Sequence, residues 1–324
     1  MRMADAERPS RVVSLDHARR GGGEELTGAS PEVLRRLSAL EAQVEHALAS
    51  ARPRDDPADV VSGMLDDALG AYSDLRRWWS DRTGGARSAG GELARRILFR
   101  LWWRVEVEGF ERVPSAGRVL VVVHRAAPLI PYATFMAAEA FVSPSRAAIP
   151  CVEPALLRAP LLGAMLAALG GRPATAREVE GILGRDALAV VAPESPRAIG
   201  KSWAARYRLG PLTRVALLRA AIATGAPIVP LAAIGSEETQ PSLARLPALG
   251  RVLGLPAFPL ALSPLPLPVK WVLHVGEPLE VAARWPPATA RDPLALRTLR
   301  IEVRDRLAWL LREGQRRRHG GGSR

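Results

Sequence analysis

The sequence contains little cysteine, lysine or aromatic residue. Its 324 residues include one cysteine, Cys151, which excludes an internal disulfide framework and a cysteine-based zinc site. Lysine occurs only at positions 201 and 270, so arginine supplies nearly all of the positive charge. Aromatic residues make up 5% of the chain. Hydrophobic residues nevertheless make up 48%, which suffices for a globular core and excludes a wholly disordered chain.

Long uninterrupted hydrophobic segments are also missing. Residues 1–8 have no apolar core, so we expect no signal peptide at this end. The longest uncharged run, 252–269, contains prolines at 256, 259, 264, 266 and 268, which an isolated membrane-spanning helix would not tolerate. The sequence therefore predicts a soluble or peripheral protein of the cytoplasm.

Acidic residues are outnumbered by basic ones. The chain has 33 Asp and Glu against 45 Lys and Arg, a formal net charge of +12 at pH 7. Such an excess indicates an anionic partner: nucleic acid, anionic lipid or a phosphorylated substrate. A basic nucleic-acid-binding protein is the less favoured alternative, because the sequence has no zinc-ligand spacing, no aromatic-basic strand motif and no helix-turn-helix pattern. We therefore expect an anionic membrane surface and no nucleic acid as partner.

Changes in composition divide the chain into four parts. Residues 1–30 are polar and glycine-containing, and we expect them to be disordered. Residues 31–91 show two helical apolar patterns and then a glycine-rich linker, which predicts a helical N-terminal extension. Residues 92–312 form the main domain, and residues 313–324 form a basic tail.

Short apolar strands alternate with helical patterns in the main domain. Strands are predicted at 119–123, 146–150, 187–192, 227–234 and 270–275. Helices are predicted at 93–104, 131–141, 155–169, 212–224 and 294–312. Because unbroken apolar strands alternating with helices are typical of sheets buried on both faces, the expected fold class is α/β. Its sheet would be mixed, mostly parallel and flanked by helices.

Polar residues follow these strands at the edge where chemistry collects in α/β sheets. His124 comes directly after strand 119–123, and Glu194 follows strand 187–192. A basic loop comes after Glu194. A histidine, a carboxylate and several cations together suit an anionic substrate whose hydroxyl is activated by the histidine. The predicted site, lining one pocket, has a catalytic histidine and four substrate-binding residues: His124, Glu194, Lys201, Arg206 and Arg208.

From about 93 to 285, the chain resembles the glycerolipid and lysophospholipid acyltransferase superfamily. An ordered series of short motifs carries the resemblance: Val122-Val123-His124, Gly170-Gly171-Arg172-Pro173-Ala174, Val191-Ala192-Pro193-Glu194-Ser195, Gly200-Lys201, Arg206-Tyr207-Arg208-Leu209, Gly225-Ala226-Pro227-Ile228-Val229-Pro230, Gly235-Ser236-Glu237-Glu238, Lys270-Trp271 and Gly276-Glu277-Pro278. Each motif alone is weak, but their order and spacing fit throughout.

The resemblance implies transfer of a fatty acyl group from acyl-CoA or acyl-carrier protein to a hydroxyl of a glycerolipid or lysophospholipid. In that family, a histidine in the position of His124 acts as general base. The Pro-Glu-Gly motif, here Pro193-Glu194-Ser195, helps to bind the polar head of the acceptor. The thioester is a co-substrate, so no cofactor and no metal are expected.

The sequence departs from the family at the aspartate that orients the histidine. The two positions where that aspartate would fall carry Leu129 and Ala133. Glu139 or Glu153 could replace it if the fold brings either one near His124. An active enzyme with a rearranged relay and a catalytically impaired, acyltransferase-like lipid-binding protein therefore both remain open.

Residues 92–104 combine arginine and tryptophan on an amphipathic helical pattern. Arg96, Arg100 and Arg104 form one stripe, and apolar residues including Trp102 lie beside it. This composition suits the lipid headgroup boundary, although a helix packed on the sheet is an equal alternative. If the helix does bind lipid, the protein would be peripherally associated with the inner face of the membrane.

Overall fold

The computed structural model describes residues 12–13, 95–126, 130–143, 145–159, 162–196, 201, 203–246, 258–261 and 266–320. Contacts divide the chain into two units, of which 16–82 is one. The predicted helical extension, and the predicted disorder apart from 12–13, lie outside the described residues.

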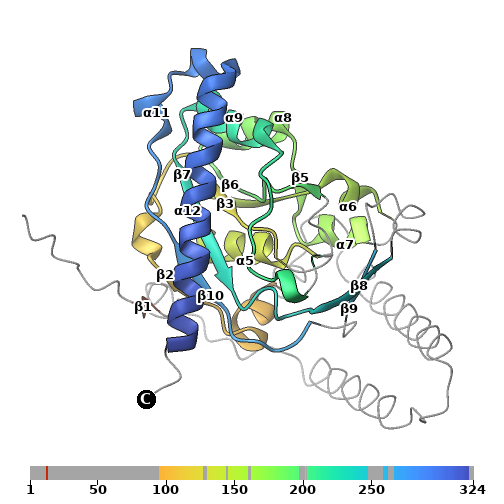
Figure 1. The fold of residues 1–324 in the computed structure, drawn as a ribbon. Coiled ribbons are helices and arrows are strands. Elements are labelled where there is room, and N and C mark those ends of the chain that lie inside the picture. The colour runs from red at the N-terminus through yellow and green to blue at the C-terminus, as the bar shows by residue number, and fades with distance from the viewer. Residues whose placement is uncertain are drawn as a thin grey trace, which may run out of the picture. The chain divides into compact units, whose positions relative to one another are not determined.

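An eight-stranded sheet forms the centre of the main domain, in the order β1-β2-β10-β7-β3-β6-β4-β5 (Figure 1). Its strands are β1 (Val12–Val13), β2 (Glu106–Glu108), β3 (Val119–Val123), β4 (Ala148–Val152), β5 (Arg172–Pro173), β6 (Leu188–Val191), β7 (Ile228–Ile234) and β10 (Val272–Val275). The strands from β7 to β5 are parallel to their neighbours, whereas β10 is antiparallel to β7. The predicted α/β class with a mixed, mostly parallel sheet is confirmed.

Helices cover both faces of this sheet (Figure 1). One side carries α5 (Tyr132–Phe141), α6 (Pro154–Arg158) and α7 (Leu162–Ala168). The other side carries α8 (Ala176–Leu183), α9 (Val215–Thr224) and the long α12 (Pro293–Gly320). Smaller described elements are the helical turns η1 (Leu98–Trp102), η2 (Phe110–Arg112), η4 (Trp203–Ala205), α11 (Val281–Arg284) and η5 (Pro287–Arg291), and the antiparallel pair β8 (Ser242–Leu246) and β9 (Phe258–Ala261).

The central strand β3 explains why its sequence is apolar throughout. Val119, Val121 and Val123 belong to the core on the α5 side. Leu120 and Val122 belong to the core on the α9 side. Because successive side chains of a strand point to opposite faces, a strand buried between two helical layers needs apolar residues at every position.

The helices predicted at 155–169 and 294–312 differ most from their predicted extent. The helix predicted at 155–169 is two helices, α6 and α7, with Pro160 between them in the sequence. A proline inside a helix removes a backbone hydrogen bond, so a break there is physically reasonable. The last helix was predicted to end at 312, but α12 continues to Gly320. Its final turns are held by side-chain pairs such as Arg317 with Glu313 at 2.9 Å.

The helix predicted at 93–104 is partly a core element. Its described part is helical from Arg95 and ends as the π-helical turn η1. Trp103, directly after η1, is fully buried and stacks on Trp271 with ring centroids 4.8 Å apart. Trp102 is half-buried, and its indole N–H donates to the carbonyl of Pro266 at 2.8 Å. The two tryptophans are thus engaged by the protein itself.

Candidate functional site

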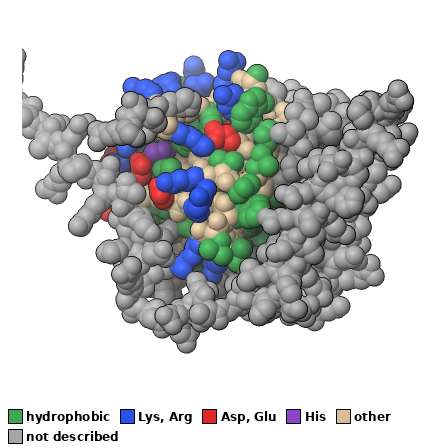
Figure 2. Space-filling view, turned by 90° about the horizontal axis from the view of Figure 1, so that it is seen from below, with side chains coloured by type: hydrophobic (Ala, Val, Ile, Leu, Met, Phe, Trp, Pro, Cys, Tyr) green, Lys and Arg blue, Asp and Glu red, His purple; other side chains and the backbone are tan. Residues whose placement is uncertain are grey.

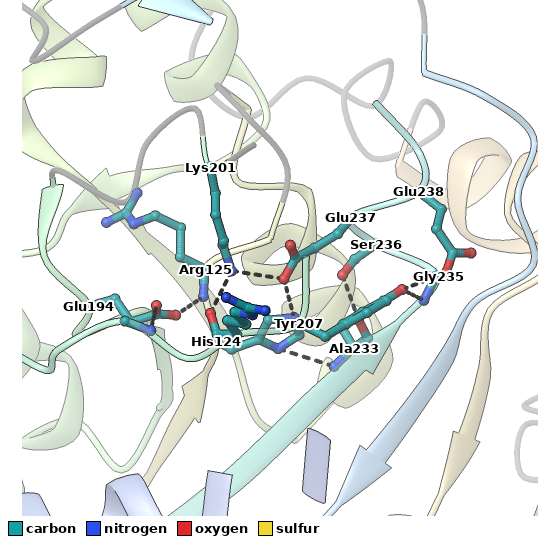
Figure 3. A network of polar contacts seen from close by, with 12 residues as sticks. His124, Arg125, Glu194, Lys201, Tyr207, Ala233, Gly235, Ser236, Glu237 and Glu238 are labelled. Atoms are coloured by element: carbon teal, nitrogen blue, oxygen red, sulfur yellow. Dashed lines mark hydrogen bonds and ion pairs between the residues drawn. The ribbon is translucent and has the colours of Figure 1, made fainter. Parts of the chain in front are cut away.

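The loops after three parallel strands meet at one edge of the sheet. Strand β3 is paired with β6 on one side and with β7 on the other, in the same direction as both. His124 follows β3, Glu194 comes shortly after β6, and the turn 235–238 follows β7. The carboxyl edge of the sheet therefore gathers side chains from three distant parts of the chain (Figure 3).

His124 is closed off from solvent, with a side-chain exposure of 0%. Its Nδ1 accepts the backbone N–H of Ala233 in a long contact of 3.5 Å, just beyond the last ladder pair of β3 and β7. Its Nε2 has no hydrogen-bond partner among the described residues. Burial, and secondarily the charge of Lys201, lowers the pKa of His124 to about 3, so the imidazole is neutral at pH 7.

Glu194 links two loops through hydrogen bonds to backbone N–H groups, and these bonds do not go to the imidazole of His124. One carboxylate oxygen accepts the backbone N–H of Arg125 at 2.5 Å, and the other accepts that of Gly210 at 2.6 Å. The whole residue is buried. Because Arg125 is the next residue after His124, Glu194 fixes the backbone that presents the histidine. The two predicted residues thus belong to one loop cluster (Figure 3).

The three predicted cations have different environments. Lys201 Nζ donates to Glu237 Oε1 at 2.9 Å and to the carbonyl of Arg208 at 3.1 Å. Arg206 is exposed, and its guanidinium lies 4.4 Å from the ring centroid of Trp203. The side chain of Arg208 is exposed. Of these three residues, Lys201 is therefore the one that is linked to His124, through its contact with Glu237.

Glu237 is the site residue that the sequence did not single out. Its Oε1 lies 3.6 Å from Nε2 of His124 and also binds Lys201, as Figure 3 shows. Burial raises the pKa of Glu237 to about 7, although Lys201 acts in the opposite direction. The available signals were its position at the third residue after a predicted strand and its place in the motif Gly235-Ser236-Glu237-Glu238.

The two glutamates that could replace the missing aspartate of the motif have partners other than His124. Glu139, on α5, forms an ion pair with Arg95 at 3.2 Å. Glu153 pairs with Arg214 and lies 3.7 Å from Arg125. Ala133 is buried in the apolar core on the α5 side, so an aspartate there would lie among hydrophobic residues. Leu129 lies outside the described residues.

The turn that carries Glu237 depends on a glycine. Gly235 has a φ of 99°, and a Cβ at this position would lie 2.4 Å from the carbonyl oxygen of Lys270. Its N–H donates to the Tyr207 hydroxyl oxygen at 2.7 Å, while that hydroxyl donates to Glu238 at 3.1 Å. Only a residue without a side chain fits this turn without displacing the backbone at Lys270, just before β10, so Gly235 fixes the place of Glu237.

The described part of the chain contains neither a metal cluster nor a membrane-spanning helix. There, no three His, Cys, Asp or Glu side chains converge in a way that could hold a metal ion. None of the helices described is long and apolar enough to cross a membrane. The chemistry at hand is a buried neutral imidazole beside a carboxylate and an ammonium group, which is an arrangement for moving a proton.

Comparisons with known proteins give relatives without an assigned activity. No protein-family model matches the chain. It is 34% identical over 221 residues to the uncharacterized protein Rv0502 of Mycobacterium tuberculosis, covering 65% of this chain and 61% of that protein. It is 33% identical over 221 residues to the uncharacterized protein ML2427 of Mycobacterium leprae, covering 65% of this chain and 60% of that one. The matched part thus spans less than two thirds of these relatives.

Among solved structures, the chain is similar to the 1-acyl-sn-glycerophosphate (LPA) acyltransferase PlsC from Thermotoga maritima. The sequence identity is 18% and the TM-score is 0.41, with 76% of this chain and 86% of that chain covered.

Proposed function

We propose that the protein is an O-acyltransferase that moves a fatty acyl group from a thioester to a hydroxyl of a glycerolipid or lysophospholipid. The observation that carries the proposal is the placement of His124. It is a buried, neutral imidazole directly after the central parallel strand, beside a carboxylate and a lysine. The ordered motifs from Val122-Val123-His124 to Gly276-Glu277-Pro278 point to the same chemistry.

In this mechanism, His124 accepts the proton of the acceptor hydroxyl as its oxygen attacks the thioester carbonyl carbon. A carbon–oxygen bond forms, the carbon–sulfur bond breaks, and the proton passes from the imidazole to the departing thiolate. A histidine must be neutral to begin this step, and the lowered pKa of His124 keeps it so.

The remaining predicted residues would act on the acceptor. We assign anion binding to Lys201, Arg206 and Arg208, because a phosphate-bearing headgroup needs cations near the reacting hydroxyl. Glu194 would act at the acceptor end of the site through the two loops that it fastens. The acyl donor, acyl-CoA or acyl-carrier protein, is a co-substrate, so the reaction requires no resident cofactor.

The acceptor class suggests where the protein works. Lysophospholipids reside in membranes, so we propose peripheral attachment to the inner face of the membrane. The face seen in Figure 2 carries basic and hydrophobic side chains together with a few acidic ones, and its basic side chains would suit an anionic lipid surface.

A lipid-binding protein without transferase activity is the second candidate. The observation in its favour is that the His124 imidazole is closed to solvent and has a pKa of about 3, which makes it a weak base. The aspartate of the family motif is also absent at Leu129 and Ala133.

Transfer from labelled thioesters distinguishes these two functions. Purified full-length protein is incubated with acyl-CoA and acyl-carrier-protein donors of several chain lengths and a panel of lysophospholipids. We expect ester formation that falls at least 10²-fold in His124→Ala, the effect typical of losing a general base. His274→Gln is the matched control, because His274 lies in β10 and pairs with Glu108.

Two results would contradict the proposal. Activity that survives His124→Ala would remove the assigned base. Tight binding of lysolipids without any transfer would favour the lipid-binding alternative.

A further inference from the structure

We propose that Glu237 is the positioning carboxylate of His124, held in place by Lys201 and taking the role that the missing aspartate has in the family motif. The inference rests on the proposed acyl transfer and adds a residue to it. Glu237 comes from the turn after β7, far from His124 in the sequence but beside it at the carboxyl edge of the sheet (Figure 3).

The contacts of the imidazole define which nitrogen faces the carboxylate. Nδ1 receives the backbone N–H of Ala233, so Nδ1 carries the lone pair. In this tautomer, Nε2 bears the hydrogen, and Nε2 is the atom that lies 3.6 Å from Glu237 Oε1. Glu237 therefore faces the N–H of the ring, as an orienting carboxylate must.

This tautomer also assigns the atom that takes the proton. The contact of Nδ1 with Ala233 is long, 3.5 Å, and an acceptor hydroxyl would replace it. When Nδ1 takes the hydroxyl proton, the ring becomes positively charged, and the negative charge of Glu237 stabilises it across Nε2. The proton then leaves with the thiolate, so Glu237 itself neither gains nor loses a proton in the cycle.

The other carboxylates near this edge have partners elsewhere. Glu194 accepts two backbone N–H groups, and Glu238 accepts the Tyr207 hydroxyl and pairs with Arg318. Glu153 is held by Arg214. Glu237 is the carboxylate for which the described contacts include the imidazole.

The charge state of Glu237 is set by groups from several elements. Lys201 and a backbone hydrogen bond at Tyr207 favour the ionised form, whereas burial and the charge of Glu194 oppose it. The balance places the pKa of Glu237 at about 7. Since only the ionised carboxylate stabilises the charged ring, we expect turnover to rise with pH through about 7.

The kinetic test compares Glu237→Gln with Glu238→Gln. Gln at 237 preserves the shape of the side chain but removes its charge. We expect kcat to fall at least 10²-fold with KM changed less than threefold, and the dependence on pH near 7 to disappear. Loss of the carboxylate in a serine-protease triad lowers turnover about 10⁴-fold, which sets the upper range. Glu238→Gln should keep the kcat and the pH dependence of the wild type.

Histidine NMR tests the pairing without any turnover. In ¹⁵N-histidine-labelled protein, the His124 resonances should show the Nε2–H tautomer and shift as the pH passes through about 7. In Glu237→Gln, this shift should vanish while the His274 resonances stay unchanged. A His124 ring that titrates identically in both proteins would overturn the pairing.

These readouts separate the two proposals. If the wild type transfers acyl groups and Glu237→Gln has the same kcat and the same pH dependence, the role of Glu237 is overturned and the acyltransferase proposal stands. No transfer by the wild type, with the NMR coupling present, would overturn acyl transfer but support the pair. If Glu237→Gln does not fold, Lys201→Met replaces it: loss of the cation should move the His124 NMR transition to higher pH, and an unmoved transition would contradict the proposal.

Discussion

Burying Glu237 has an energetic consequence of its own. Its side chain is 6% exposed, and burial raises its pKa from the ordinary 4.5 to about 7. The folded protein therefore holds a proton on this carboxyl more tightly than the unfolded chain does. By linkage, the free energy of unfolding falls as the pH rises from about 4.5 to about 7, because folding must then take up a proton that the unfolded chain has already released.

Glu237→Gln should remove this dependence. Between pH 5 and pH 8, we expect the wild type to lose up to about 3 kcal/mol of unfolding free energy relative to the variant. Urea denaturation at the two pH values measures the difference, and Glu238→Gln serves as control. If the unfolding free energies of the wild type and of Glu237→Gln change with pH in the same way, Glu237 loses its proton as easily in the folded protein as in the unfolded chain.

The sequence predicted one half of this pair and missed the other for a physical reason. His124 stands out because it directly follows the apolar strand 119–123, a local pattern. Glu237 joins it only because β7 is the neighbour of β3 in the sheet, and strand order depends on packing of the whole domain. The turn at 235–238 was visible as a strand end, but nothing in its residues indicated which other strand end it would meet.

The helical turn η1 illustrates how an amphipathic pattern leaves its partner open. The position of Trp102 beside the arginine stripe fitted a lipid-facing helix and, equally, a helix packed on the sheet. In the structure, the indole N–H of Trp103 donates to the carbonyl of Leu267 at 3.0 Å, and the ring is fully buried. Periodicity predicts that one face is covered, but not whether protein or lipid covers it. By contrast, β3 was predicted to the residue, because a strand buried on both faces has no such ambiguity.

A lipid contact through this segment would therefore have to use other residues. Leu101 is 71% exposed, and the next exposed residue along the chain is Arg104. We expect Leu101→Ser to weaken binding to anionic vesicles about tenfold, since a leucine buried in lipid contributes about 1.5–3 kcal/mol. Co-sedimentation measures this binding, and it should decline with salt.

The control for this experiment is Trp203→Ser, because Trp203 is also exposed, at 41%, but lies in η4. Equal binding by Leu101→Ser and the wild type would exclude η1 from the membrane contact. Substituting Trp103 is unsuitable for the test, because loss of a buried tryptophan costs about 3–5 kcal/mol of stability by itself.

At the scale of the main domain, the last helix, α12, packs along the α9 side of the sheet (Figure 1). Its C-terminal turns are joined to the sheet at Glu108 of β2. This carboxylate lies 2.9 Å from His274 Nδ1 of β10 and 3.1 Å from an Arg317 nitrogen of α12. One side chain thereby connects two strands and a helix. Residues 313–320, which were predicted as part of a basic tail, belong to α12 and help to attach it to the sheet.

The contacts of Glu108 should make the attachment of α12 to the sheet sensitive to acid. The hydrogen bond from His274, together with the positive charges of His274 and Arg317, holds the pKa of Glu108 below its ordinary 4.5. A carboxyl with a lowered pKa stabilises the folded state above pH 4.5, and this contribution is lost as the pH falls through the lowered value. We expect Glu108→Gln to be about 1 kcal/mol less stable than the wild type at pH 6. That difference in unfolding free energy should shrink as the pH falls below 4.5, and urea denaturation at several pH values measures it. A difference that stays constant down to pH 3 would show that Glu108 contributes through its shape and not through its charge.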